Sequence, residues 1–217
     1  MKDFVYDEQS WMVRYMVSDT GGWLRGRQIL LTPHAFGLRP FGVSPNQPEV
    51  LRVSINRKKI EDGPFIATKH AITREDEEAY YDYYGLQVYW RPSDTKGAPA
   101  FPARLHVSAS EPVTADSAAS ASGAHLHGTR ALTGYQLRAS DGLIGSVQDL
   151  RVDDKTWAIV EIVVEIGRWF ASKKIVIRTG SIERIDHAES TIRVNLSLRD
   201  IRRTMRNDVA SVGGGRR

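Results

Sequence analysis

The chain has 217 residues, of which 41% are hydrophobic and 26% are charged, and its formal net charge is +4. It contains no cysteine, which excludes disulfides, thiol catalysis and cysteine-ligated metal centres. It also has no apolar run long enough to cross a membrane and no apolar signal segment at its start, so we expect a soluble, cytoplasmic protein.

One stretch of the chain occurs twice. The segment Trp11–Phe36 matches Trp157–Ile182 at a constant offset and without a gap. The identical pairs are Trp11 with Trp157, Val17 with Val163, Gly21 with Gly167, Trp23 with Trp169 and Ile29 with Ile175. After a loop that is shorter in the second copy, the match continues and Ile60 faces Ile201. The chain is therefore predicted to be a tandem repeat of one β-rich unit.

The first copy lacks the hairpin that opens the second. Residues 134–146 are typical of a strand, an Asp-Gly turn and a strand, whereas Met1 aligns with Val147 and leaves nothing to match them. An unpaired strand edge is normally covered. Three explanations stay open: a start codon further upstream, a truncated chain, or strands supplied by the linker or by a second molecule. We favour the last and expect a homodimer or intimate contact between the units.

Alternation of apolar and polar residues, together with turn residues, predicts the strands of both units. The expected strands cover 12–19 and 28–31 in the first unit, and 132–138, 144–152, 158–166, 174–178, 181–186 and 191–196 in the second. Short strands between turns favour small antiparallel barrels that are closed or nearly closed. We predict a mainly β fold with two such barrels in tandem, each followed by a short helix.

Composition places the boundaries between these parts. Residues 1–90 form the first unit with its tyrosine-rich extension, and 129–206 form the second. Between them, residues 91–128 are rich in Pro, Ala, Ser and Gly and are expected to be a flexible linker. Residues 207–217, with a run of glycines, are expected to be a disordered tail.

A tryptophan follows the same turn in both units, Trp23 in the first and Trp169 in the second. An indole needs a large apolar contact and a partner for its N–H, so we expect both rings to close the end of a barrel. Binding of a partner or ligand by these rings is the alternative. Both tryptophans are therefore candidate partner-binding residues.

The densest aromatic cluster lies on a helix that is predicted to begin after Thr73 and to end at Gly85. Thr73 suits an N-cap, the acidic run 75–78 suits the positive end of the helix dipole, and Gly85 suits a C-cap. So many rings cannot all face one core. They either dock the connector onto its own barrel or a dimer mate, or form an exposed partner-binding surface. The candidate residues are Tyr80, Tyr81, Tyr83, Tyr84, Tyr89 and Trp90.

Arginines concentrate at the end of the second unit. Apolar Leu198, Ile201 and Met205 share one face of the expected helix, and the arginines lie mostly elsewhere. Such a basic face is either simply solvated or binds nucleic acid or an anionic membrane surface. The arginines concerned are Arg199, Arg202, Arg203 and Arg206.

Two short runs together resemble a known family: Asp-Gly-Leu-Ile-Gly at 141–145 and Val-Ser-Asp-Thr-Gly-Gly-Trp at 17–23. Residues 130–205 resemble the PRC-barrel domain, the small β-barrel of the cytoplasmic part of the photosynthetic reaction-centre H subunit and of a ribosome maturation factor. Residues 3–90 resemble stand-alone bacterial tandem members of that family. The resemblance implies the barrel fold and an adaptor role, and it carries no catalytic motif to transfer.

The residues contain no recognisable catalytic or cofactor motif. The chain has no nucleophile elbow and no dinucleotide-binding glycine motif, and its only closely spaced histidines are His125 and His127, so we expect no enzyme, cofactor or metal. The leading hypothesis is an adaptor that binds a protein partner, in the electron-transport or photosynthetic setting that the resemblance implies. The alternative is an RNA- or ribosome-associated assembly factor that uses the C-terminal arginines.

Overall fold

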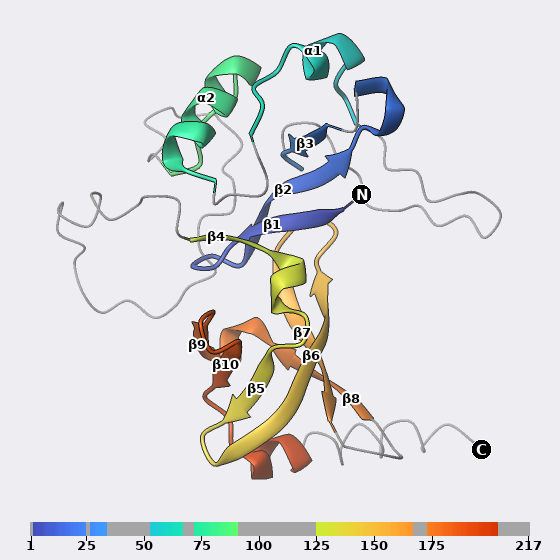
Figure 1. Cartoon of the computed structure of the whole chain (residues 1–217). Coiled ribbons are helices and arrows are strands. Elements are labelled where there is room, and N and C mark those ends of the chain that lie inside the picture. Colours follow the sequence, from blue (N-terminus) through green and yellow to red (C-terminus); the bar gives the residue numbers. More distant parts are fainter. Residues whose placement is uncertain are drawn as a thin grey trace, which may run out of the picture. The chain divides into compact units, whose positions relative to one another are not determined.

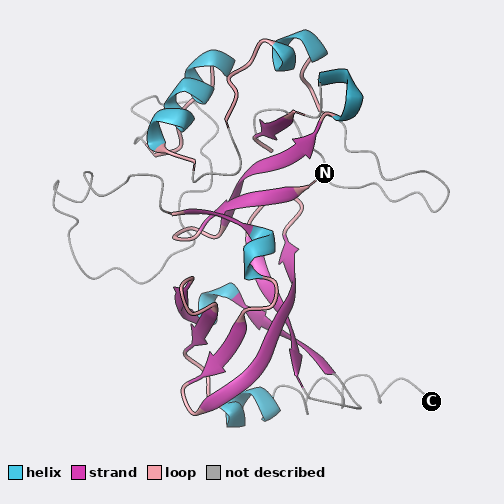
Figure 2. Ribbon diagram, in the orientation of Figure 1, coloured by secondary structure: helices cyan, strands magenta, loops and turns pink. Residues whose placement is uncertain are grey.

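The computed structural model describes residues 2–24, 27–33, 53–66, 72–90, 125–166 and 173–203. Within these ranges the fold is mainly β, with one sheet of four strands, one of six and few helices (Figure 2). The expectation of a mainly β fold is confirmed. Trp169, Arg206, residues 207–217 and most of the expected linker lie outside the described residues.

The chain forms two compact units. The first comprises Met1–Gly128 together with Asp154–Ala158, and the second comprises Thr129–Asp153 together with Ile159–Arg217. A short turn between two strands of the second unit, residues 154–158, thus belongs to the first unit.

The first unit is built on a sheet with the strand order β3-β2-β1-β4 (Figure 1). The strands are β1 (Asp3–Asp7), β2 (Met12–Asp19), β3 (Gln28–Leu31) and β4 (Leu126–Gly128), and all neighbours are antiparallel. Its helices are the 3-10 helix η1 (Gly21–Leu24) between β2 and β3, followed by α1 (Arg57–Glu61) and α2 (Arg74–Tyr84). The bounds of β2 and β3 are those predicted from the sequence.

Strand β4 covers the outer edge of β1. Val5 pairs with Gly128, and Asp7 pairs with Leu126. β4 comes from the end of the segment that was expected to be a flexible linker. The edge that the missing hairpin would have occupied is therefore paired within the chain, by a strand from the linker.

The two copies of the repeat share an unusual backbone conformation. Trp11 and Trp157, which the repeat matches, have φ angles of 57° and 60°, in the left-handed region that bulky residues rarely adopt. The next matched pair, Met12 and Ala158, forms an antiparallel bridge within the first unit. The repeat is therefore visible in the backbone as well as in the sequence.

We expect Trp157→Gly to be about 1 kcal/mol more stable than Trp157→Ala. Both variants lose the packing of the buried indole, whose ring lies 6.0 Å from that of Phe4. Only glycine adopts this φ without a Cβ penalty of about 1–2 kcal/mol. At the neighbouring Ala158 φ is not positive, so Ala158→Gly should lower the free energy of unfolding by about 0.5–1 kcal/mol. Denaturant unfolding measures both differences. A Trp157→Gly variant that is less stable than Trp157→Ala would contradict the positive φ of Trp157.

The second unit is a sheet with the strand order β8-β7-β6-β5-β10-β9. The strands are β5 (Gln136–Ala139), β6 (Gly142–Val152), β7 (Ile159–Ile166), β8 (Lys173–Arg178), β9 (Ile182–Asp186) and β10 (Thr191–Val194). The 3-10 helix η3 (Thr129–Leu132) precedes β5, and η4 (Thr179–Ser181) joins β8 to β9. Leu132, which was expected to open a strand, lies fully buried in η3 instead.

This sheet is not a closed antiparallel barrel, which corrects the prediction from sequence. β10 runs parallel to β5 while all other neighbours are antiparallel, so β8 and β9 point in the same direction. Parallel pairing requires a crossover of about a dozen residues or more, whereas η4 spans three. In the described part of the chain β8 and β9 therefore do not pair with each other and are the end strands of the hydrogen-bonded order, as β3 and β4 are in the first unit.

The predicted helices are α2 in the first unit and residues 198–203 in the second, whereas the short helix α1 was not predicted from the sequence. Asn56 caps α1, and Ser197 caps the helical residues 198–203 through its side-chain oxygen. The matched residues Ile60 and Ile201 are both buried. The two copies of the repeat therefore end in the same way.

Candidate functional site

The aromatic helix α2 has the ends that the sequence predicts. Thr73 forms a capping box with Asp76, because Thr73 Oγ1 accepts the N–H of Asp76 at 3.1 Å and the Asp76 carboxylate accepts the N–H of Thr73 at 2.9 Å. At the other end Gly85 takes a left-handed conformation with φ of 67°. Both ends of the helix are fixed, so its tyrosines project in defined directions.

Two of the candidate tyrosines pack α2 onto its own sheet. Tyr80 and Tyr81 are 2% and 4% exposed. The Tyr80 hydroxyl donates to the carbonyl oxygen of Leu30 in β3 at 3.0 Å, and its ring meets that of Tyr15 edge-on at 5.4 Å. Burial raises the pKa of Tyr81 to about 12, which keeps its hydroxyl protonated. This half of the aromatic cluster is the docking contact, one of the two predicted alternatives.

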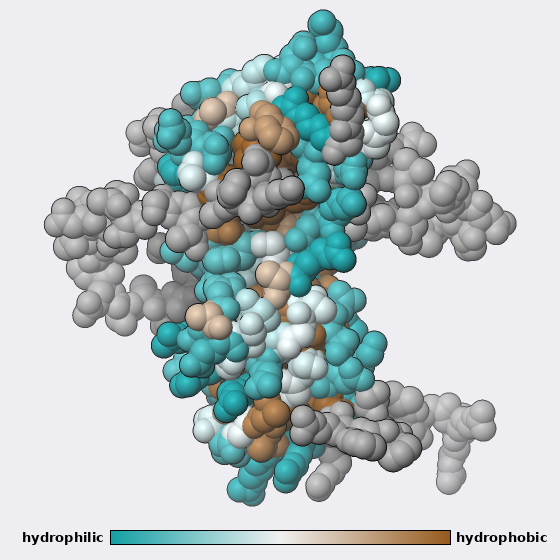
Figure 3. Space-filling view, in the orientation of Figure 1, coloured by the Kyte–Doolittle hydropathy of each residue, from teal (hydrophilic) through white to brown (hydrophobic). Residues whose placement is uncertain are grey.

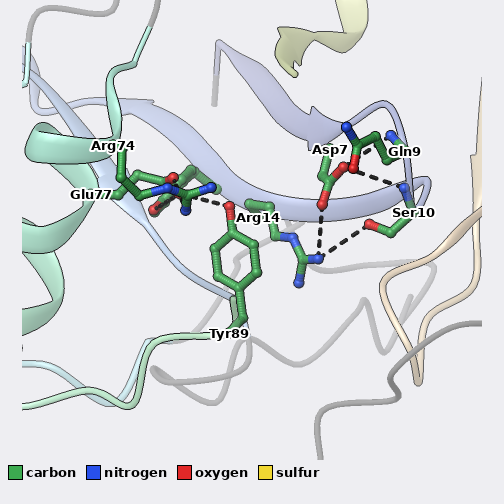
Figure 4. A network of polar contacts seen from close by, with 8 residues as sticks. Asp7, Gln9, Ser10, Arg14, Arg74, Glu77 and Tyr89 are labelled. Carbon is green, nitrogen blue, oxygen red and sulfur yellow. Dashed lines mark hydrogen bonds and ion pairs between the residues drawn. The ribbon is translucent and has the colours of Figure 1, made fainter. Parts of the chain in front are cut away.

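A completely buried carboxylate, that of Glu77, anchors the helix. Its Oε1 accepts hydrogen bonds from the hydroxyls of Tyr15 and Tyr89, both at 2.8 Å, and its Oε2 accepts one from Arg74 at 2.8 Å. Figure 4 shows Arg74 and Tyr89 next to Glu77. Burial of an ion costs several kcal/mol unless it is paired and hydrogen-bonded. The three donors supply that pairing.

Stacked arginines hold the segment that follows α2. The guanidinium of Arg14 lies 3.8 Å from the ring centroid of Tyr89, and that of Arg74 lies 4.1 Å from the centroid of Trp90. Arg14 also pairs with the buried carboxylate of Asp7 at 3.0 Å (Figure 4). Tyr89 and Trp90 therefore belong to the network that fixes this segment to the sheet.

This network is structural. A general base must reach the proton that it removes from a substrate, and the Glu77 side chain has no exposed surface. Burial also raises the pKa values of Tyr15 and Tyr89, so both phenols stay protonated as donors to Glu77. The hydrogen bonds of this cluster hold α2 in its position in the first unit.

The two buried carboxylates have opposite effects on the pH dependence of stability. Burial raises the pKa of Glu77 above its usual 4.5, against the hydrogen bonds that it accepts from the two tyrosines. Burial also acts on Asp7, but the charge and hydrogen bonds of Arg14 outweigh it and lower the pKa of Asp7 below its usual 3.8. The contribution of Glu77 to stability therefore falls as pH rises from 4.5 through its folded pKa. That of Asp7 is present above 3.8 and is lost as pH falls through its folded pKa.

We therefore expect Glu77→Gln to cost more unfolding free energy at about pH 4.5 than at about pH 7. Asp7→Asn should show the reverse, costing more at about pH 7 than at about pH 3. Denaturant unfolding of the two variants and the wild type across this range tests both signs. The same pH trend in both variants would contradict the assignment of the two carboxylates.

A second group of aromatic side chains lies on the surface around α1. Trp23, Phe65 and Tyr83 are 38%, 63% and 39% exposed, although such rings are usually buried. The aromatic–basic face consists of Trp23, Phe65, Tyr83, Arg27, Arg57 and Lys59. Figure 3 shows apolar residues at the surface of the molecule with hydrophilic ones around them.

Cation–π contacts hold two of these rings in place. The guanidinium of Arg57 lies 4.5 Å from the ring centroid of Trp23, and that of Arg27 lies 4.9 Å from the centroid of Phe65. Arg27 also donates to the carbonyl oxygen of Gly63 at 2.9 Å, in the loop that leads to Phe65. Trp23 and Phe65 are therefore each in contact with an arginine.

The end of α2 closes the aromatic–basic face. The Tyr83 hydroxyl donates to the carbonyl oxygen of Lys59 at 3.1 Å, and the rings of Tyr83 and Tyr84 meet edge-on at 4.9 Å. Helix α2 thus buries Tyr80 and Tyr81 against the sheet and presents Tyr83 to solvent. The docking alternative therefore holds for Tyr80 and Tyr81, and partner binding through the exposed Tyr83 stays a prediction.

Trp23 does not close a barrel, which corrects the prediction from sequence. It lies in η1, a 3-10 helix in which no residue is buried. The sheet beside it does not close on itself among the described strands, so they provide no barrel end for the ring to fill. The indole instead lies at the surface against Arg57.

The arginines near the end of the second unit face solvent. Arg199, Arg202 and Arg203 are exposed, whereas Ile201 between them is buried. The predicted amphipathic pattern is confirmed for residues 198–203. Exposure is consistent with both alternatives, solvation and an anionic ligand.

No protein-family model matches the chain, and no curated protein matches it either. The resemblance to PRC-barrel proteins therefore stays a prediction. Across the described ranges, no helix has the length and apolar character needed to span a membrane.

Proposed function

We propose that the chain is a non-enzymatic adaptor and that its first unit binds a protein partner through the aromatic–basic face. The observation that carries this proposal is the exposure of Trp23, Phe65 and Tyr83 on neighbouring elements of one unit. Clustered apolar exposure on a soluble surface marks an interaction site. Aromatic residues and arginine are also enriched among the anchors of protein interfaces.

The contacts that hold the residues of the aromatic–basic face in place make this face suitable for binding. The buried Glu77 network and the cap at Gly85 fix α2, and the arginine stacks restrain the rings of Trp23 and Phe65. A surface that is ordered before association loses less conformational entropy when the partner binds. The face is therefore preorganised for recognition.

The resemblance to reaction-centre H subunits suggests the setting of this adaptor, a complex of electron transport or photosynthesis. In that family the barrel acts by covering a partner and not by catalysis. Association of two copies of the chain is part of the same proposal.

A second candidate function is an RNA- or ribosome-associated assembly factor. The exposed Arg199, Arg202 and Arg203 favour it, because phosphate groups are recognised by accessible guanidinium groups. Such binding weakens steeply as salt increases. Nuclease-sensitive capture that disappears at moderate salt would favour this candidate over the adaptor.

Site-specific photo-cross-linking in the native cell tests the adaptor function. A photoreactive phenylalanine analogue replaces Phe65, and the control carries it at Leu143, which is 53% exposed in the second unit. We expect a discrete cross-linked protein from position 65 that is missing from position 143. Identical products from both positions, or none from position 65, would count against the proposal.

A further inference from the structure

Strand β8 and its neighbour β7 carry complementary rows of side chains. On one face of the sheet the register pairs Glu165 with Lys174, Val163 with Val176 and Glu161 with Arg178. Residues two apart in a strand share a face. Two pairs of opposite charge therefore flank a pair of valines, and each is a stabilising cross-strand combination.

The other edge of β8 has no neighbouring strand among the described residues, since β8 is the last strand of the sheet on that side. Lys174 and Arg178 are exposed, and Val176 is 36% exposed. The other end of the hydrogen-bonded strand order is β9 (Figure 1). An edge strand of this kind presents backbone N–H and C=O groups that can pair with an incoming strand.

We propose that the β8 edge binds an extended acidic segment of a partner protein, which adds to the sheet as a further strand. The segment has one acidic residue two positions before an apolar residue and another two positions after it. Strand β7 shows this spacing in Glu161, Val163 and Glu165. Main-chain hydrogen bonds supply the attachment, and the side chains of alternate residues supply the selectivity. Lys174 and Arg178 then face carboxylates, and Val176 faces an apolar side chain.

A second copy of β8 does not fit this edge. In an antiparallel pair centred on Val176, Lys174 of each copy would lie opposite Arg178 of the other. Like charges that face each other directly across a sheet are destabilising. The cations that oppose self-pairing are the groups that favour an acidic strand. The β8 edge belongs to the second unit, whereas the aromatic–basic face belongs to the first.

Fluorescence anisotropy with labelled synthetic peptides tests the proposal on the full chain. The probe is the peptide Thr-Glu-Thr-Val-Thr-Glu-Thr, in which glutamate and valine alternate at every second position and so share one face of a strand, and the control peptide has the same composition with its glutamates grouped at one end. We expect the alternating peptide to bind more tightly and to slow the hydrogen exchange of β8 backbone amides. Equal binding of the two peptides, or unchanged exchange in β8, would overturn the proposal.

A pair of matched variants separates the edge from general electrostatic attraction. Lys174→Gln with Arg178→Gln removes two charges from β8, and Arg184→Gln with Arg193→Gln removes two exposed charges from β9 and β10. We expect the first variant to weaken peptide binding by at least about fivefold and the second to have little effect. Equal losses would mean that net charge alone attracts the peptide and would overturn the proposal.

Hydrogen exchange of the full chain at several protein concentrations tests the remaining occupant, a second copy of the chain. The proposal predicts that β8 amides exchange at the same rate over a wide range of protein concentration without peptide. Protection of β8 that grows with concentration and that the peptide does not compete for would assign the edge to a second copy and overturn the proposal.

Discussion

Gly145→Ala should lower the free energy of unfolding of the second unit by about 3 kcal/mol. A Cβ at this position would clash with the carbonyl oxygen of Glu165 in the neighbouring strand β7. That oxygen belongs to the backbone of the β6–β7 ladder and cannot rotate away. Glycine here permits the close approach of two backbones, which explains the second glycine of the run at 141–145.

Two other glycines of the same unit provide matched controls. A Cβ at Gly142 would lie 2.9 Å from Cδ1 of Leu198, the far end of a flexible side chain, and a Cβ at Gly180 meets nothing within 4 Å. Gly142→Ala should therefore cost less than about 1 kcal/mol and Gly180→Ala close to nothing. Chemical denaturation followed by circular dichroism ranks the three variants. A Gly145→Ala protein as stable as Gly180→Ala would show that β6 and β7 are not in this register.

Glu77→Ala should destabilise the first unit by about 3 kcal/mol, which is the second large effect. Removing the carboxylate leaves the hydroxyls of Tyr15 and Tyr89 and the guanidinium of Arg74 without their acceptor. Each buried polar group without a partner costs about 1–3 kcal/mol. The Arg74 side chain is 21% exposed, so water compensates part of its loss.

Glu75→Ala is the control on the same helix, because Glu75 is an exposed acidic residue of the first turn. It should cost less than about 1 kcal/mol, through the helix dipole alone. Glu77→Gln should fall between the two variants, since an amide oxygen still accepts the tyrosine hydroxyls. Equal costs for Glu75→Ala and Glu77→Ala in the same denaturant series would contradict the buried network.

Local signals in the sequence predicted the local structure well. The bounds of β2 and β3, the Thr73 cap and the Gly85 end of α2 all depend on residues close together in the chain. The repeat was also detectable, and its two tryptophan turns have the same backbone conformation. These features are set by periodicity and backbone preference, which short segments reveal.

The sheet topology depends on contacts that the sequence pattern does not contain. Alternation in β5 and β10 predicts two strands, but nothing in either strand states that they pair in parallel. That single pairing leaves β8 and β9 pointing the same way and keeps the sheet open. The surface position of Trp23 is a separate matter in the first unit, where the described strands form a four-stranded sheet with no barrel end for the ring to close.

The burial of Glu77 could have been anticipated from spacing. Glu77 lies three and four residues before Tyr80 and Tyr81, so the three side chains share one face of α2. That face is buried, and the acidic residue on it therefore requires donors. The donor Tyr15 comes from a distant strand and the donor Tyr89 from the segment that follows α2, and only the structure identifies them.

The measurement that tests the central claim most directly uses the partner protein that is captured by cross-linking at position 65. Its affinity is measured for the purified full chain and for a triple variant of the chain. The variant carries Trp23→Ser, Phe65→Ser and Tyr83→Ser, and Leu143→Ser serves as the exposed apolar control. Interface anchors are worth about 2 kcal/mol or more each, so the triple variant should bind at least about a hundredfold more weakly. Its circular dichroism and the affinity of the control should match the wild type. A folded triple variant that binds as tightly as the wild type would show that the aromatic–basic face is not the binding surface.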